Sequence, residues 1–139
     1  MPVCVFFGHR ECYGLKRELL QSAVEEKIAE GFDTFYVGNQ GDFDGMVRSV
    51  LRELQKKHPK IRYGVVLAYF PTEGEQEEDT MYPEGLELGP PKFAITRRNR
   101  WLVRQADCVI CYITHSWGGA AQFVEQARRQ GKQILNLAE

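Results

Sequence analysis

The sequence predicts an α/β fold in which a five-stranded parallel sheet, in strand order 3-2-1-4-5, is covered by helices on both faces. Two observations support this prediction. Short and almost wholly apolar runs alternate with longer stretches whose apolar residues recur every three to four positions, and glycine-rich loops follow the apolar runs. Right-handed crossovers between parallel strands then give the strand order.

Size and composition indicate a soluble globular chain. The 139 residues are 43% hydrophobic and 27% charged, with a net charge of −1. This length fits a single domain, residues 1–139, whose core needs no metal or disulfide. The balanced charge gives no general field for nucleic acid. No signal peptide and no membrane-spanning run is recognisable, so we expect a cytoplasmic protein without membrane contact.

The predicted elements follow from periodicity and from turn residues. The strands are residues 3–7, 34–37, 63–69, 108–113 and 133–137. The amphipathic helices start near residues 15 and 42 and cover residues 94–105 and 120–130. Either Asp42 or Asp44 is expected to cap the second helix. In the last helix, Ala120, Val124 and Ala127 are expected to face the core.

Residues 70–89 interrupt this rhythm. They contain Pro71, Pro83 and the acidic run 73–79, which is too polar to pack inside a core. We expect a solvated loop, with a lid over the rim of the sheet as the alternative. Five carboxylates would repel an anionic ligand, so direct ligand contact from this run is not expected.

Three of the four cysteines lie in predicted strands, where cysteine behaves as a small apolar residue. Cys108 and Cys111 have the spacing of a redox motif, but three residues apart on a strand they point to opposite faces. Cys12 lies in a loop with His9, and His115 joins them if the strand ends are neighbours. A metal site there is a minor alternative, and we expect neither a metal nor a cofactor.

A predicted strand leads through Ser116 and Trp117 to the pair Gly118 and Gly119 and then into the last helix at Ala120. The first amides of a helix lack partners, and glycines let a ligand approach the backbone closely. This stretch is therefore interpreted as a binding site for a phosphate or ribose-phosphate group. The alternative is a loop whose glycines allow tight packing. Trp117 either stacks on a base or caps the edge of the core.

The carboxyl ends of the first two predicted strands should lie beside this same phosphate-binding stretch, at the topological switch point where the strand order reverses. Arg10 clamps a phosphate or pairs with Glu11, and the polar loop after the second strand contacts ribose hydroxyls or a base edge. The loop after the first strand, residues 8–14, lacks the dinucleotide fingerprint, so a standard NAD site is not expected. The remaining predicted ligand-binding residues of these two loops are Gly8, His9, Gly38, Asn39, Gln40, Gly41 and Asp42.

Arginines on the third predicted helix divide by direction. Arg97, Arg100 and Arg104 point away from the apolar stripe, whereas Arg98 lies on its flank and Asn99 lies in it. An arginine half-turned inward needs a carboxylate or a ligand phosphate. We expect Arg98 to clamp an anion. The alternative is a structural pair with an acidic side chain, Asp107 or Glu125.

Several of these motifs, in their order, resemble the SLOG superfamily, and most closely its small YpsA-like proteins. The motifs are residues 7–10, 38–42, 98–103, 106–107, 118–120 and 131–132. The resemblance implies a Rossmann-like three-layer sandwich, a nucleotide or nucleotide-derived ligand and self-association as a homodimer. The superfamily also contains the Lonely Guy phosphoribohydrolases and DprA, which binds single-stranded DNA.

We therefore expect a sensor-type domain that binds a nucleotide-like small molecule. The alternative implied by the resemblance is a nucleoside 5′-monophosphate phosphoribohydrolase, in which Arg98 orients the substrate and Glu125 stabilises a ribosyl cation or positions water. Ala121 and Gln122 stand where those enzymes have Gly-Thr, and Trp117 replaces a proline, which argues for binding over hydrolysis. The overall charge argues against a third alternative, single-stranded DNA binding.

Overall fold

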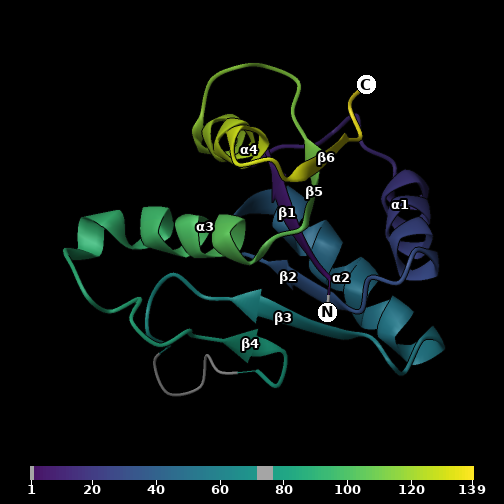
Figure 1. Ribbon diagram of the computed structural model, residues 1–139, viewed down its shortest axis with the longest axis horizontal. Helices are drawn as coiled ribbons and strands as arrows, with labels where there is room; N and C mark the ends of the chain where they lie inside the picture. The colour runs from purple at the N-terminus through teal and green to yellow at the C-terminus, as the bar shows by residue number, and fades with distance from the viewer. Residues whose placement is uncertain (1, 72–76) are drawn as a thin grey trace.

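The strands form one parallel sheet in the order β4-β3-β2-β1-β5-β6 (Figure 1). The structure, a computed structural model, describes residues 2–71 and 77–139. None of the helices described is both long and apolar enough to cross a membrane. The strands are β1 Val3–Gly8, β2 Thr34–Val37, β3 Arg62–Val66, β4 Thr80–Met81, β5 Cys108–Tyr112 and β6 Gln133–Asn136. The helices are α1 Arg17–Ala29, α2 Gly41–Lys57, the short η1 Pro91–Phe93, α3 Ala94–Gln105 and α4 Gly119–Arg129.

The sheet has a hydrophobic core on each face. Alternate residues of β1 point to opposite sides, so that Cys4 and Phe6 pack under α1 and α2, whereas Val5 and Phe7 pack under α3 and α4. Figure 1 shows the two pairs of helices on opposite sides of the sheet. Burial on both faces explains why the central strands are continuous apolar runs. Cys108 and Cys111 lie in different cores, as their spacing predicted.

The predicted strand count was one too low. β4 lies within residues 70–89, predicted as loop, and pairs in parallel with the end of β3. A strand of two residues, Thr80 and Met81, is too short to show an alternating pattern in the sequence. The five predicted strands are all present, and their predicted order is confirmed by the order of β3, β2, β1, β5 and β6 in the sheet.

Asp79 anchors β4, which corrects the prediction that the acidic run is simply solvated. Its carboxylate accepts hydrogen bonds from Arg48 Nε at 3.0 Å, Arg52 Nη2 at 3.1 Å and the Tyr63 hydroxyl at 3.0 Å. Hydrogen bonding from Arg48 is the main reason that the pKa of Asp79 falls to about 2. Residues 73–76 of the run lie outside the described part of the chain.

Both helix starts at the rim differ from the prediction. Neither candidate aspartate caps α2 with its side chain; Gln40 is the N-cap residue, and its backbone N–H donates to Asp44 Oδ2 at 2.9 Å. α4 starts one residue earlier than predicted, at Gly119, and Ala120 is only partly buried. Val124 and Ala127 are buried as predicted, together with Ala121 and Phe123.

β1 and β5 lie side by side at the centre of the sheet, with Gly8 opposite Tyr112 at their carboxyl ends. The chain leaves β1 toward α1 on one face and leaves β5 toward α4 on the other. Open α/β sheets bind ligands in the crevice that such a divergence creates. The predicted switch point is therefore present.

Gly8 should be intolerant of a side chain. A Cβ at this position would lie 2.3 Å from Cγ of Phe43, whose ring is fully buried. We expect Gly8→Ala to lower the free energy of unfolding by about 1–3 kcal/mol, because the packed ring has little room to move. Urea denaturation measures the loss.

Gly45→Ala is the matched control for this substitution. A Cβ on Gly45 would meet nothing within 4 Å, and the residue lies inside α2. We expect a gain of about 0.5–1 kcal/mol there, because alanine favours a helix interior over glycine. Equal effects of the two substitutions would contradict the close packing of Phe43 on Gly8.

Candidate functional site

A cavity of about 240 Å³ lies where the carboxyl ends of β1 and β2 approach α3 and α4. This is the crevice expected from the strand order. Its walls are partly apolar and partly polar. The residues that line it are Phe6, Phe7, Gly8, Arg10, Gly38, Gln40, Asp44, Ile95, Arg98, Asn99, Leu102, Gly119 and Ala120.

The structure brings some of the predicted ligand-binding residues together in this cavity and leaves others outside it. The cavity is lined by Gly8, Arg10, Gly38, Gln40, Arg98, Asn99, Gly119 and Ala120 from the predicted set. The predicted residues that do not line it are His9, Asn39, Gly41, Asp42, Ser116, Trp117 and Gly118.

Packing within the rim explains several of these exclusions. His9 Nε2 accepts a hydrogen bond from the Thr114 amide at 3.0 Å. The His9 ring stacks on His115 with centroids 3.6 Å apart, and Trp117 stacks on the other side of His115 at 3.8 Å. Gly118 is the N-cap of α4 with φ 96°, a backbone conformation that disfavours other residues. These residues shape the connection between β5 and α4.

The histidine pair has no third metal ligand among the described residues. Cys12, the third member of the metal site considered from the sequence, is buried. Burial, with a smaller effect of His115, lowers the pKa of His9. Nδ1 of His115 is buried without a hydrogen-bond partner in the described part of the chain. The His115 ring is stacked between the rings of His9 and Trp117.

Arg98 is the most deeply buried cation of the site, with 2% of its surface exposed. Nη1 donates to the Val66 carbonyl at 2.9 Å and to Asn39 Oδ1 at 3.2 Å, and Nε donates to Asn99 Oδ1 at 2.8 Å. Nη2 has no hydrogen-bond partner among the described residues, and it keeps some accessible surface. The Arg98 side chain also lines the cavity.

The alternative partners considered for Arg98 are engaged elsewhere. Asp107 Oδ2 accepts from the Val3 amide at 2.8 Å. Glu125 lies on the outer face of α4, where its carboxylate pairs with Arg128 at 3.7 Å and Arg129 at 3.4 Å. Glu125 does not line the cavity. The structural pairing considered for Arg98 is therefore wrong.

Gly38 makes room for the guanidinium. A Cβ on Gly38 would lie 2.7 Å from Arg98 Nη1 and 3.0 Å from Asp44 Oδ2. Both charged groups therefore crowd the same side of this glycine at the end of β2. They do so without forming an ion pair.

Asp44 is the pocket residue whose role the sequence interpretation missed. It was considered only as a helix cap, but it belongs to the buried stripe of α2 together with Val47, Leu51 and Leu54. That spacing of three, four and three residues could have revealed a buried carboxylate. Asp44 is 9% exposed, and no described residue donates to its Oδ1. Burial raises its pKa to about 6, although the Gln40 amide and Arg98 oppose the rise.

The start of α4 forms the opposite wall, through Gly119 and Ala120. The first amides of a helix have no intrahelical acceptor, and the helix dipole adds positive potential there. Arg10 lines the same cavity from the exposed loop after β1. The site therefore has three sources of positive charge, and within the described part of the chain Asp44 is its one carboxyl group.

Arg97 does not point freely into solvent as predicted. It donates to the carbonyls of Leu86 at 2.8 Å and Pro90 at 2.8 Å and so holds the segment before α3. Ile95, whose apolar side chain is 37% exposed, lines the cavity. A separate hollow of about 570 Å³ lies beside α2 and residues 77–79. Its charges largely bond one another, and it is away from the switch point.

The sequence matches no protein-family model and no curated protein. The structure is similar to the X-ray structure of DNA processing protein A (DprA) from Streptococcus pneumoniae, with a TM-score of 0.67 and 17% sequence identity. The match covers 96% of this chain and 49% of that chain, so this chain spans about half the length of its neighbour. At this identity the likeness shows the fold alone, a Rossmann-like α/β domain related to that of DprA.

The raised pKa of Asp44 gives a test of its burial. Between its ordinary value of 3.8 and about 6, the folded chain holds a proton that the unfolded chain releases, so this group's contribution to stability falls as the pH rises through that window. Asparagine cannot ionise and keeps an acceptor for Gln40. We expect the free energy of unfolding of Asp44→Asn, relative to that of wild type, to increase by about 2–3 kcal/mol when the pH is raised from 4 to 7.5.

Urea denaturation of both proteins at the two pH values measures this gain. Other titrating groups are common to the two chains, so their contributions cancel in the difference. If the two proteins differ in free energy of unfolding by the same amount at both pH values, burial does not oppose ionisation of Asp44 in the folded chain.

Proposed function

We propose that this chain is a SLOG-type sensor domain that binds a nucleotide or a nucleotide-derived ligand and places its phosphate against the start of α4. The observation that carries the proposal is the cavity at the switch point, lined both by Gly119 and Ala120 and by the buried Arg98. Unpartnered amides at a helix N-terminus favour an anion, and the nearby guanidinium adds to the positive potential of the cavity.

The position of Arg98 supports binding by a preformed site. Its guanidinium is held by Val66, Asn39 and Asn99, so a ligand need not order a long side chain. Its Nη2 has no partner among the described residues, and the side chain lines the cavity while only 2% exposed. A charge-assisted hydrogen bond in such a place is stronger than one on the surface.

The position of Glu125 favours binding over hydrolysis. In the alternative suggested by the Lonely Guy resemblance, this carboxylate acts on the ribosyl group. Here its side chain is 50% exposed and paired with arginines of its own helix. Among the residues that the structure describes, Asp44 alone contributes a carboxyl group to the cavity lining. We therefore assign no bond cleavage to the site.

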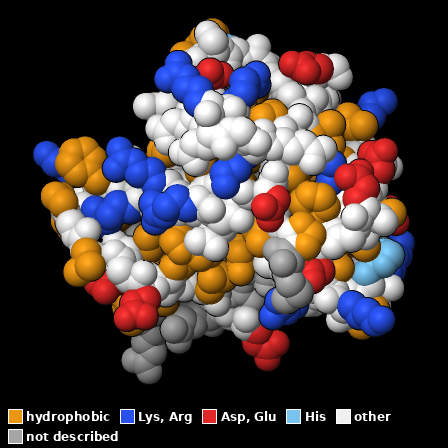
Figure 2. All heavy atoms as spheres, in the orientation of Figure 1, with side chains coloured by type: hydrophobic (Ala, Val, Ile, Leu, Met, Phe, Trp, Pro, Cys, Tyr) orange, Lys and Arg blue, Asp and Glu red, His pale blue; other side chains and the backbone are white. Residues whose placement is uncertain are grey.

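Single-stranded DNA binding remains the third candidate. Figure 2 shows Lys and Arg side chains gathered over α3, which gives a local basic surface. Arg97 is committed to backbone carbonyls, and the whole chain carries a net charge of −1. Salt-sensitive retention of oligonucleotides would favour this candidate over the sensor. Our proposal further includes self-association as a homodimer and a cytoplasmic location, which sedimentation and cell fractionation test.

Ala120→Asp separates phosphate binding from folding. A carboxylate in the first turn of α4 favours the helix through its dipole but repels an anion in the cavity. We expect thermal stability to be kept or raised and the affinity for phosphate-bearing nucleotides to fall at least tenfold. Calorimetric titration with a panel of nucleotides and cyclic nucleotides measures it. Gln122→Asp adds the same charge outside the cavity and should retain most of the affinity.

Glu125→Gln tests the absence of a catalytic role. Because this side chain lies outside the cavity, we expect unchanged affinity for the same panel, and no free base from any nucleoside monophosphate with either protein. Chromatography of the incubated nucleotides detects the base. Release of base by wild type that stops in Glu125→Gln would replace the sensor proposal with the hydrolase.

A further inference from the structure

Two side chains that line the cavity, those of Arg98 and Asp44, each have one polar atom without a protein partner among the described residues. Nη2 of Arg98 is a donor, and Oδ1 of Asp44 is an acceptor when the carboxyl is ionised. Both atoms keep some accessible surface. Among the described residues, the one fully buried polar side-chain atom without a partner is Nδ1 of His115. Arg98 and Asp44 are 2% and 9% exposed, and both line the cavity.

These atoms belong to groups that crowd one glycine. Nη1 of Arg98 and Oδ2 of Asp44 both lie within 3.0 Å of the position that a Cβ on Gly38 would take. The two side chains therefore border the cavity near Gly38. A ligand that bonds to both side chains must present a hydrogen-bond acceptor to Arg98 and a hydrogen-bond donor to Asp44.

A phosphate group does not meet this requirement. Its oxygens accept from Nη2, but the ionised carboxylate beside it repels them, and a dianion has no proton to donate to Oδ1. Two neighbouring hydroxyl groups meet it fully, because one can accept while the other donates. The edge of a nucleobase offers similar donor and acceptor chemistry.

The size of the cavity favours the hydroxyls. Its volume of about 240 Å³ is below the roughly 300–1,000 Å³ of pockets that enclose a drug-sized ligand. It therefore suits a pentose phosphate rather than a complete nucleotide. With phosphate at Gly119 and Ala120, the sugar occupies the interior toward Gly38, and a base remains outside.

We propose that Asp44 and Arg98 recognise the vicinal 2′,3′-diol of a ribose 5-phosphate unit, so that the site selects ribose phosphates over their 2′-deoxy forms. This inference rests on the proposed function, whose phosphate seat sets the orientation of the sugar. Asp44 becomes the residue that determines sugar specificity, and the enclosed part of the site makes no contact that selects the base.

Isothermal titration at pH 7.5 tests the proposal with five probes: ribose 5-phosphate, 2-deoxyribose 5-phosphate, adenosine 5′-monophosphate, its 2′-deoxy form and inorganic phosphate. We expect wild type to bind each ribose form about 10–100-fold more tightly than its deoxy partner, since a hydrogen bond to a charged group is lost. In Asp44→Ala the ratio of the affinity for a ribose form to that for its deoxy partner should fall to about one, with no loss of affinity for inorganic phosphate.

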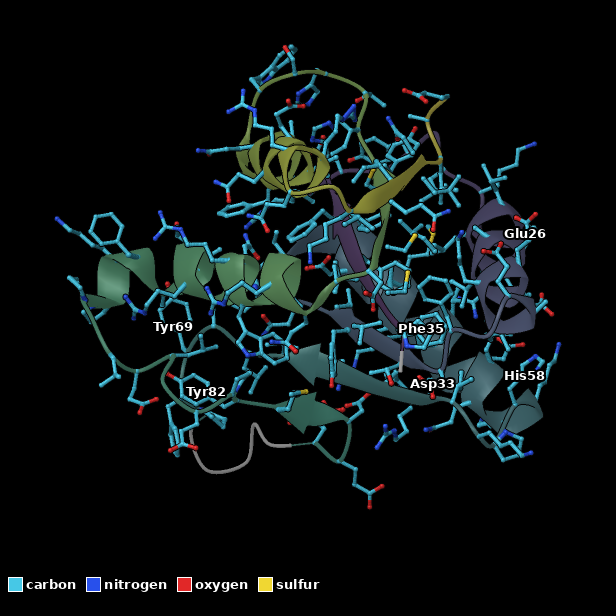
Figure 3. The ribbon with its side chains drawn as sticks, in the orientation of Figure 1. Glu26, Asp33, Phe35, His58, Tyr69 and Tyr82 are labelled. Atoms are coloured by element: carbon cyan, nitrogen blue, oxygen red, sulfur yellow. The ribbon has the colours of Figure 1, made fainter. Side chains whose placement is uncertain are left out.

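Two further variants keep the test decisive. Asp44→Asn preserves the shape of the side chain and should reduce the ratio at least threefold even if the alanine variant folds poorly. Asp33→Ala is the matched control and should keep the wild-type ratio. Asp33 precedes β2 at its amino end, and Figure 3 shows it near Phe35 and away from Tyr69, which follows β3.

Equal binding of ribose and deoxyribose forms, or a ratio that persists without the Asp44 carboxyl, would overturn the sugar assignment and leave the phosphate seat standing. Tight binding of adenosine monophosphate without binding of ribose 5-phosphate would also overturn it, because the base would then occupy the interior. If no probe binds, inorganic phosphate included, the proposed function and this inference both fail.

Discussion

The positively charged guanidinium of Arg98 is almost completely buried, and several residues at the rim of the sheet hydrogen-bond to it. Removing such a group from solvent costs several kcal/mol unless hydrogen bonds and charges compensate. The terminal carbonyl of β3, two asparagine side chains and the nearby Asp44 supply that compensation. Burial still lowers the pKa of Arg98, which shows that the compensation is incomplete.

Asp44 experiences the opposite effect of the same burial. Its carboxyl is taken from water by α2, and its partner, the Gln40 amide, uses only one oxygen. The pocket thus contains a donor and an acceptor that protein contacts leave unsatisfied. Such groups cost stability in the empty chain and become useful when a ligand supplies the missing partner. This is the physical reason for regarding the cavity as a binding site rather than a packing defect.

Periodicity in the sequence was sufficient for most of the fold. The predicted helix 94–105 coincides with α3, and the central strands β1 and β5 were recognised because burial on both faces leaves an apolar run. β4 was missed because contacts between Asp79 and distant arginines define it, and such contacts leave no local pattern. At the site, strand ends predicted the neighbourhood correctly. Side-chain direction within the loops was not predictable, so His9 and Trp117 were assigned to a ligand although they stack with His115.

The short β4 also affects how the molecule meets its neighbours. An open parallel sheet has two edges, and a long bare edge invites strands from other molecules to pair with it. Here the edge next to β3 ends in only two residues, preceded by carboxylates that are tied to α2. So short and charged a border gives an incoming strand little backbone to pair with, and it protects this side of the chain from sheet extension and aggregation.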